Sequence, residues 1–148
     1  MADAGNLYGR PIHGCLCRHR FLPGSKGGLY GWAQAAGFAR IVVVEGLFDI
    51  AALWQAGFPN TIAVLGSHLN KRQLAQLCQS RDRLIYICFD ADRNGSGQRA
   101  AHGLSMQLQQ AGIEARRVAL PLGHDPASFF AAGATACDFG RCLERARP

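Results

Sequence analysis

The stretch from Leu84 to Asn94 reads LIYICFDADRN, an apolar run that ends in two aspartates separated by one alanine. Its β-favouring Ile, Tyr and Phe residues, with no polar alternation, predict a strand that is buried on both faces of a sheet. Asp90 and Asp92 then lie at the carboxyl end of that strand. Residues two apart in an extended chain point the same way and lie about 6.5 to 7 Å apart, so the two carboxylates converge.

Two carboxylates held on one side of a short loop repel each other, and a bound divalent cation removes that repulsion. Hard oxygen ligands of this kind suit Mg²⁺ or Mn²⁺ better than zinc. The same pair is also typical of a solvated turn that caps the next helix. The pair alone therefore leaves both interpretations open.

Strand-like and helix-like segments alternate along the chain on both sides of this stretch. The apolar runs that we predict to be strands are 41–44, 61–66, 84–89 and 114–122. The segments with helical spacing are 45–57, 67–80 and 95–112. In the first helical segment, Phe48, Ala51, Ala52 and Gln55 stand at the helical spacing i, i+3, i+4 and i+7. This alternation predicts an α/β fold with a mainly parallel central sheet of about four strands flanked by helices.

Half of the ten acidic residues fall at or just after the ends of these predicted strands. In open sheets of this type, sites form outside the carboxyl ends of the strands, and neighbouring strands lie about 5 Å apart. We therefore expect a group of carboxylates along one edge of the sheet. The candidate residues are Glu45, Asp49, Asp90, Asp92 and Asp125.

The composition fits one compact globular domain with a positive surface. The chain has 148 residues, of which 49% are hydrophobic and 18% charged, with a net charge of +6. A basic body around a group of acids indicates a polyanionic partner, although the preference for arginine over lysine also fits a genomic composition bias. The amino terminus lacks a secretory pattern, and the most apolar stretch, 41–54, contains two acids. A cytoplasmic location without membrane insertion is expected.

Two segments before the first long strand have possible binding roles. The glycine-rich segment FLPGSKGGLYGW (21–32) carries Lys26, which either meets a phosphate or belongs to a linker. The segment HGCLCRH (13–19) has four residues that could bind zinc, two histidines and two cysteines, but in a strand its outer histidines lie roughly 20 Å apart, too far for one tetrahedral ion. The six cysteines lack a disulfide spacing, so reduced thiols are expected.

The ordered acidic motifs resemble a known family. The segments VVVEGLFDIAALWQAGFPNTIAVLGSHLNKRQL (42–74), IYICFDADRNGSGQRAA (85–101) and LPLGHDPASFF (120–130) are similar to the Toprim domain of bacterial DnaG-type primases. The lead-in from LYGRPIHG (7–14) to SKGGLYGW (25–32) resembles the stretch that precedes Toprim in those primases. The resemblance implies a Rossmann-like Toprim domain at 39–135, preceded by the lead-in at 1–38 and followed by a helical tail at 136–148.

The resemblance also implies an activity and its residues. It implies RNA primer synthesis on single-stranded DNA from nucleoside triphosphates, with Mg²⁺ or Mn²⁺, in DNA replication. Glu45, Asp90 and Asp92 would be catalytic and hold metal, with Asp49 and Asp125 supporting them or sharing a second ion. The resemblance places Lys26, Arg10 and Arg93 near the nucleotide and template.

The sequence departs from the primase pattern in three ways. The chain lacks the zinc-binding module and most of the amino-terminal half of the primase core, so a zinc-finger or primase-core partner, or a helicase, is expected. Ala127 stands where many family members have a further aspartate. Two alternatives use the same acids: a Toprim-type nuclease, and a non-catalytic module that binds nucleic acid through metal.

Overall fold

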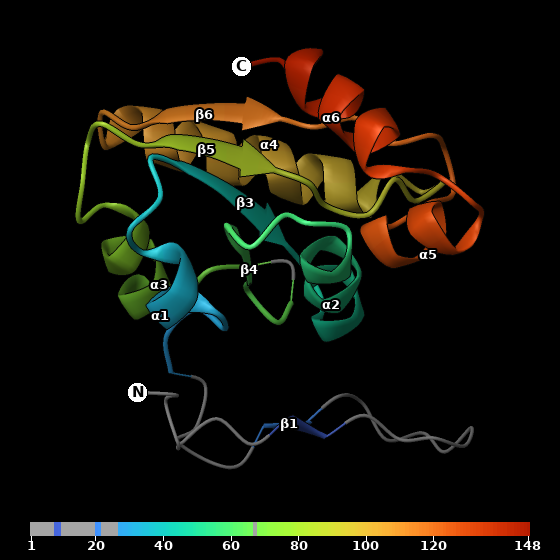
Figure 1. The fold of residues 1–148 in the computed structure, drawn as a ribbon. Helices are drawn as coiled ribbons and strands as arrows, with labels where there is room; N and C mark the ends of the chain where they lie inside the picture. Colours follow the sequence, from blue (N-terminus) through green and yellow to red (C-terminus); the bar gives the residue numbers. More distant parts are fainter. Residues whose placement is uncertain (1–7, 10–19, 22–26, 67) are drawn as a thin grey trace.

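The computed structural model of the protein describes residues 8–9, 20–21, 27–66 and 68–148 (Figure 1). The strands are β1 (Tyr8–Gly9), β2 (Arg20–Phe21), β3 (Arg40–Val44), β4 (Thr61–Ala63), β5 (Leu84–Ile87) and β6 (Glu114–Arg117). The helices are α1 (Trp32–Ala35), α2 (Leu47–Gln55), α3 (Lys71–Leu77), α4 (Ser96–Gln110), α5 (Pro126–Ala131) and α6 (Ala136–Glu144). Among these helices, no segment is both long and apolar enough to cross a membrane.

A four-stranded parallel sheet in the order β4-β3-β5-β6 forms the centre of the fold. Strand β3 pairs with both neighbours, with Val43 opposite Ile62 on one side and Ile87 on the other. The predicted α/β fold with about four parallel strands and flanking helices is therefore confirmed. The short antiparallel pair of β1 and β2, and helices α1 and α5, were not predicted, because segments of two to six residues carry too little periodicity.

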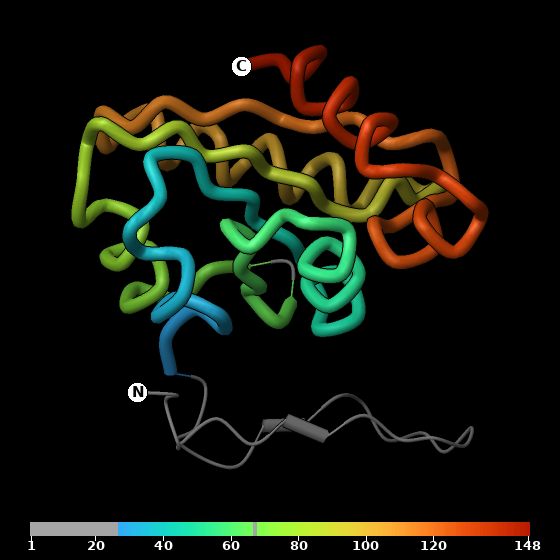
Figure 2. Tube along the Cα trace, viewed as in Figure 1, coloured from blue at the N-terminus to red at the C-terminus, as the bar shows by residue number. Residues whose placement is uncertain are grey.

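Both faces of the sheet are covered, which explains the continuous apolar runs of the strands. Ile41 and Val43 point into a core shared with residues of α1, α3 and α4. Val42 and Val44 point the opposite way, into a core shared with α2, α5 and α6. All four side chains are fully buried. The arrows of β3, β5 and β6 point the same way in Figure 1, and the tube in Figure 2 can be followed by its colours from each of these strands to the next. The carboxyl ends of the three strands therefore come to one end of the molecule.

One residue outside the sheet forms an isolated antiparallel β-bridge with each outer strand. On the β4 side, Tyr30 and Ala63 exchange two backbone hydrogen bonds of 3.0 Å. On the β6 side, Arg117 and Arg147 exchange two, of 2.6 and 3.1 Å. The four described cysteines, which are Cys78, Cys88, Cys137 and Cys142, are free, as expected for reduced thiols.

Helix α2 forms where predicted, but its buried face is not the one that the sequence indicated. Asp49, Ile50 and Leu53 are its buried residues, whereas Phe48 from the predicted stripe is 66% exposed. The helix is rotated relative to the prediction because Asp49 turns inward and accepts hydrogen bonds from two backbone N–H groups. An acid on the inner face of a helix is not something that apolar spacing detects.

A close backbone contact fixes the connection from β5 to α4. Gly95 caps α4 with a φ of 71°, a conformation that favours glycine. A Cβ placed on Gly97 would lie 2.2 Å from the carbonyl oxygen of Asp90. The absence of a side chain at Gly97 therefore lets α4 pack directly against the backbone that carries Asp90.

Substitution of Gly97 tests this contact. Gly97→Ala should lower the free energy of unfolding by about 1 to 3 kcal/mol, since the new methyl group must displace backbone atoms. The matched control is Gly140→Ala in α6, where a Cβ would meet nothing within 4 Å. That change should raise the free energy of unfolding by about 0.5 to 1 kcal/mol. Urea titrations followed by circular dichroism measure both; equal stability of the two variants would contradict the contact.

Candidate metal centre

The acids of the carboxyl edge are positioned by three strand-to-helix connections. Glu45 follows β3 directly, and Asp49 lies in the first turn of α2. Asp90 and Asp92 lie between β5 and α4, and Asp125 is the N-cap of α5. Because β3 and β5 are parallel neighbours, these connections meet at the same edge of the sheet.

Three of these acids form a compact group. Asp49, Asp90 and Asp125 each offer one carboxylate oxygen, and these oxygens all lie within 4.8 Å of one another. We refer to Asp49, Asp90 and Asp125 as the carboxylate group. Three oxygens at this separation match the ligand set of a hard divalent cation.

Asp49 is held rigidly within this group. Its Oδ2 accepts a hydrogen bond of 2.9 Å from the N–H of Gly46, and its Oδ1 accepts one of 3.3 Å from the N–H of Ala127. The two donors belong to the amino-terminal ends of α2 and α5, where helix dipoles favour a negative charge. Asp49 therefore joins two helices while it contributes a carboxylate to the site.

Glu45 and Asp92 lie beside the carboxylate group and are not part of it. Glu45 Oε1 accepts a hydrogen bond of 3.3 Å from the backbone N–H of Asp90. Asp92 Oδ2 accepts one of 2.8 Å from the hydroxyl of Ser96. The sequence predicted Glu45, Asp90 and Asp92 as the principal set, whereas the structure groups Asp90 with Asp49 and Asp125.

Burial and neighbouring negative charges raise the pKa of three of these acids. Burial raises the pKa of Asp90 to about 7, and the negative charges of Glu45, Asp49, Asp125 and Asp92 add to the effect. Burial is also the main cause of the raised pKa of Glu45 and of Asp49. Asp90 Oδ1 is buried and accepts no hydrogen bond from any described residue. A desolvated carboxylate oxygen without a donor, on a residue that is grouped with two other carboxylates, fits a bound cation.

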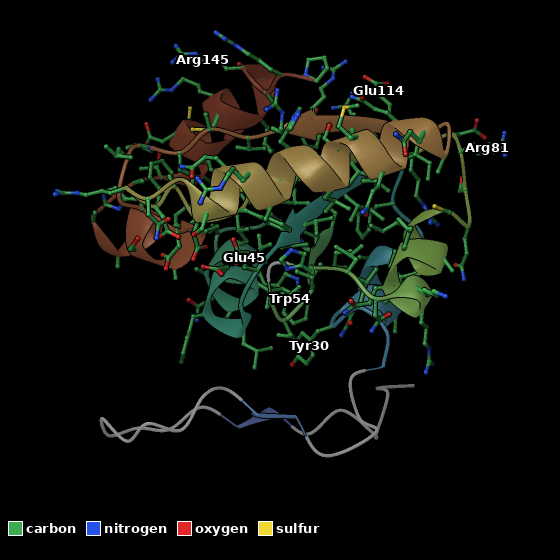
Figure 3. The ribbon with its side chains drawn as sticks, turned by 180° about the vertical axis from the view of Figure 1, so that it is seen from behind. Tyr30, Glu45, Trp54, Arg81, Glu114 and Arg145 are labelled. Carbon is green, nitrogen blue, oxygen red and sulfur yellow. The ribbon has the colours of Figure 1, made fainter. Side chains whose placement is uncertain are left out.

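A cavity of about 520 Å³ opens beside Glu45, between the loop after β4 and one side of α4. His68 and Arg99 bring basic groups to it, and Ser96 brings the hydroxyl that contacts Asp92. Figure 3 shows Glu45 at the end of the sheet, below α4. None of these three residues was predicted from the sequence. Their position just after a strand, or in the first turn of the following helix, was the available signal.

The predicted phosphate-binding residues are only partly described. Arg93 is exposed in the loop between Asp92 and α4. Lys26, Arg10 and the segment 13–19 lie outside the described residues. Gly27, which follows Lys26, accepts a hydrogen bond of 3.0 Å from Asn70 Nδ2, and Gln76 Oε1 accepts one of 2.8 Å from the N–H of Leu29. Side chains around α3 thus hold the chain that directly follows Lys26.

The fold is that of an α/β domain with its acidic edge at the carboxyl ends of parallel strands, where open sheets of this class form their sites. The family model described as Toprim-like matches residues 42–130. The chain belongs to this Toprim-like family. The matched residues include all five acids of the edge.

Related proteins are bacterial primases. DNA primase of Aquifex aeolicus is 36% identical over 98 residues, which is 66% of this chain and 19% of that protein. DNA primase of Pseudomonas putida is 34% identical over 126 residues, which is 81% of this chain and 19% of that protein. The chain therefore spans about a fifth of the length of these relatives.

Solved structures show the same similarity. The zinc-binding and RNA polymerase domains of Aquifex aeolicus primase match with a TM-score of 0.82 and 26% identity, over 96% of this chain and 37% of that one. A primase domain from Pseudomonas aeruginosa matches with a TM-score of 0.77 and 30% identity, over 97% of this chain and 47% of that one. The predicted resemblance to the Toprim domain of DnaG-type primases is confirmed.

The ionisation of Asp90 makes stability depend on pH. Its pKa is raised from 3.8 to about 7, so the folded state binds a proton more tightly than the unfolded state. The metal-free protein should therefore lose stability as the pH rises from about 4 to about 7. Asp90→Asn should flatten this decline, because an amide does not ionise.

Thermal melting in a chelator, from pH 5 to pH 8, measures the effect. The control is Asp82→Asn, an exposed acid in the loop before β5, which should keep the wild-type profile. A wild-type profile that rises between pH 5 and pH 7 would contradict the assigned ionisation.

Proposed function

We propose that this chain is the Toprim part of a primase and carries out metal-dependent nucleotidyl transfer, making RNA primers on single-stranded DNA during replication. The proposal rests on one observation. Asp90 is desolvated and has no hydrogen-bond donor at Oδ1, in a domain whose fold matches that of a primase. Asp49, Asp90 and Asp125 would hold Mg²⁺ or Mn²⁺, with Glu45 and Asp92 beside them. When bound, the metal supplies positive charge to the oxygens around the reacting phosphorus.

The residues of the chain have separate tasks in this proposal. Glu45 lines the cavity and has a raised pKa, so it is suited to accept the proton of the attacking hydroxyl. Arg99 and His68 line the same cavity and would meet the phosphates of the nucleotide. Arg93, Lys26 and Arg10 are proposed as further phosphate contacts, on the strength of the resemblance. Asp49 positions the site by tying the amino-terminal ends of α2 and α5 together.

The proposed partners follow from the length of the relatives. The matching Aquifex structure contains zinc-binding and RNA polymerase domains, and this chain covers 37% of it. We propose that single-stranded DNA and nucleoside triphosphates are the ligands. The template contacts would be completed by a zinc-finger or primase-core polypeptide, or by a helicase.

Metal binding gives the first test. At a concentration tenfold above its dissociation constant, an ion that binds only the folded state adds about 1.4 kcal/mol to stability. This corresponds to a rise in melting temperature of roughly 3 to 6 °C for a domain of this size. Asp90→Asn should remove the rise, whereas Asp82→Asn should keep it. Scans with Mg²⁺ or Mn²⁺ are compared with scans at matched ionic strength, and an equal rise in both variants would reject the carboxylate group as the metal site.

The reaction gives the second arm of the same test. The chain is incubated with single-stranded DNA, labelled ribonucleotides and Mg²⁺ or Mn²⁺, and the products are separated on a gel. Short RNA products that disappear in Asp90→Asn and persist in Asp82→Asn support primer synthesis. Shortened DNA instead would support the Toprim-type nuclease. Metal binding and DNA binding without either product would support the non-catalytic module.

The position of the nucleotide is tested at Gly103, an exposed glycine of α4 that lines the cavity beside Glu45. A Cβ at Gly103 would meet nothing within 4 Å, so packing does not require glycine there. Gly103→Leu should therefore not lower the melting temperature while it fills part of the cavity, and nucleotide affinity should fall on the order of tenfold. Gly140→Leu, at an equally open helical position, should leave the affinity unchanged. Calorimetric titration with a ribonucleoside triphosphate and Mn²⁺ measures this, and equal affinities of the two variants would exclude the cavity as the nucleotide site.

A further inference from the structure

A second cavity, of about 650 Å³, lies on the other side of α4, between that helix, β6 and the last turn of α6. Its polar lining is Gln98, Arg117, Arg145 and Arg147, together with the thiol of Cys142. Phe89, Val118 and Leu120 form a buried apolar floor. We refer to it as the arginine cavity.

The charge of the arginine cavity is one-sided. Three arginines and no acid are found among the described residues that line it. Arg117 already has an acceptor, since it donates hydrogen bonds of 3.2 and 2.7 Å to a main-chain oxygen of Pro148, the last residue of the sequence. Within the described ranges, Arg145 and Arg147 form no ion pair, and both are exposed. Of the acids in β6 and α6, Glu114 pairs with Arg116 and Asp138 pairs with Arg141. Glu144 directly precedes Arg145, is exposed, and is not among the residues that line the cavity.

The arginine cavity adjoins the carboxylate group through the β5–α4 connection. Phe89 on its floor directly precedes Asp90 in the chain. Gln98 on its wall directly follows Gly97, which packs on the carbonyl of Asp90. In Figure 3, Arg145 and Glu45 lie on opposite sides of α4, and Arg81 lies at the far end of the molecule. A polyanion bound at the carboxylate group could therefore also contact the arginine cavity by passing around the end of α4.

We propose that the arginine cavity binds backbone phosphates of a single-stranded nucleic acid whose reacting part lies at the carboxylate group. The proposal rests on the proposed function for its substrate. Guanidinium groups are planar forks that bind phosphate oxygens through paired hydrogen bonds, and phosphate contacts of this kind position a strand without reading its sequence. The net charge of +6 favours a polyanion over an apolar polypeptide segment as the occupant.

Binding of a fluorescein-labelled dT12 oligonucleotide tests the proposal by anisotropy over a series of KCl concentrations. Arg145→Ala combined with Arg147→Ala should lower the affinity on the order of tenfold. The slope of log affinity against log salt should fall by about 1.4, since each phosphate contact on a single strand contributes about 0.7. Arg81→Ala is the control, because Arg81 is exposed and lies far from both sites. It should keep the wild-type slope and affinity.

Two further readouts locate the effect. Oligonucleotide should protect Cys142 from iodoacetamide and leave Cys137 reactive, because Cys142 lines the arginine cavity and Cys137 is exposed elsewhere on α6. Ribonucleoside triphosphate affinity should be the same in the double variant and the wild type. An equal loss of nucleotide affinity would overturn the proposal in favour of a site for free nucleotide phosphates.

The outcome is separable from that of the proposed function. Wild-type affinity in the double variant, with Cys142 unprotected, overturns the proposal and leaves a polypeptide as the occupant, even if Asp90→Asn abolishes metal binding. A weakened double variant with protected Cys142 supports the arginine cavity, even if the carboxylate group binds no metal and makes no product.

Discussion

Mutual repulsion among the carboxylates is the constraint on which the rest of the site depends. Asp90 is partly desolvated and has four acids close enough to raise its pKa, which makes its ionised form unfavourable in the absence of a counter-charge. The fold offsets part of this cost through the backbone N–H groups that meet Asp49 and Glu45. It leaves Asp90 Oδ1 without such a donor. Among the described carboxylate oxygens of the edge, Asp90 Oδ1 is therefore the buried one that lacks a hydrogen-bond donor.

The parallel sheet is what makes this concentration possible. Strands β3 and β5 are neighbours and run in the same direction, so the residues that follow them emerge side by side. The apolar side chains of β3 are fully buried in the two cores and hold the strand ends in place. Gly97 then brings α4 against the backbone of Asp90. The buried residues that stabilise the fold and the carboxylates that repel one another are thus close neighbours in the same segments of the chain.

The sequence predicted the fold class and the edge at which the acids gather, because both follow from local patterns. Continuous apolar runs distinguish doubly covered strands, and the direction of parallel strands places their ends together. It placed Asp49 among the five acids of this edge, but it did not predict that Asp49, Asp90 and Asp125 form the compact group without Glu45 and Asp92. That grouping depends on the rotation of α2 about its axis, which is set by the N–H groups of Gly46 and Ala127, the second of which is 78 residues away. Long-range hydrogen bonds of this kind produce no periodic pattern in the sequence. The arginine cavity was not predicted either, because its lining residues come from three elements that are separate in the sequence.

The two single bridges at the outer strands bear on how other molecules approach the sheet. Tyr30 occupies the backbone groups of Ala63 on β4, and Arg147 occupies those of Arg117 on β6. An open strand edge is a template on which a further chain can add a strand and start aggregation. Here each outer strand is only three or four residues long, and the bridge occupies the backbone groups of its last residue. Partners are therefore expected to dock on this domain through side-chain surfaces rather than by extending its sheet.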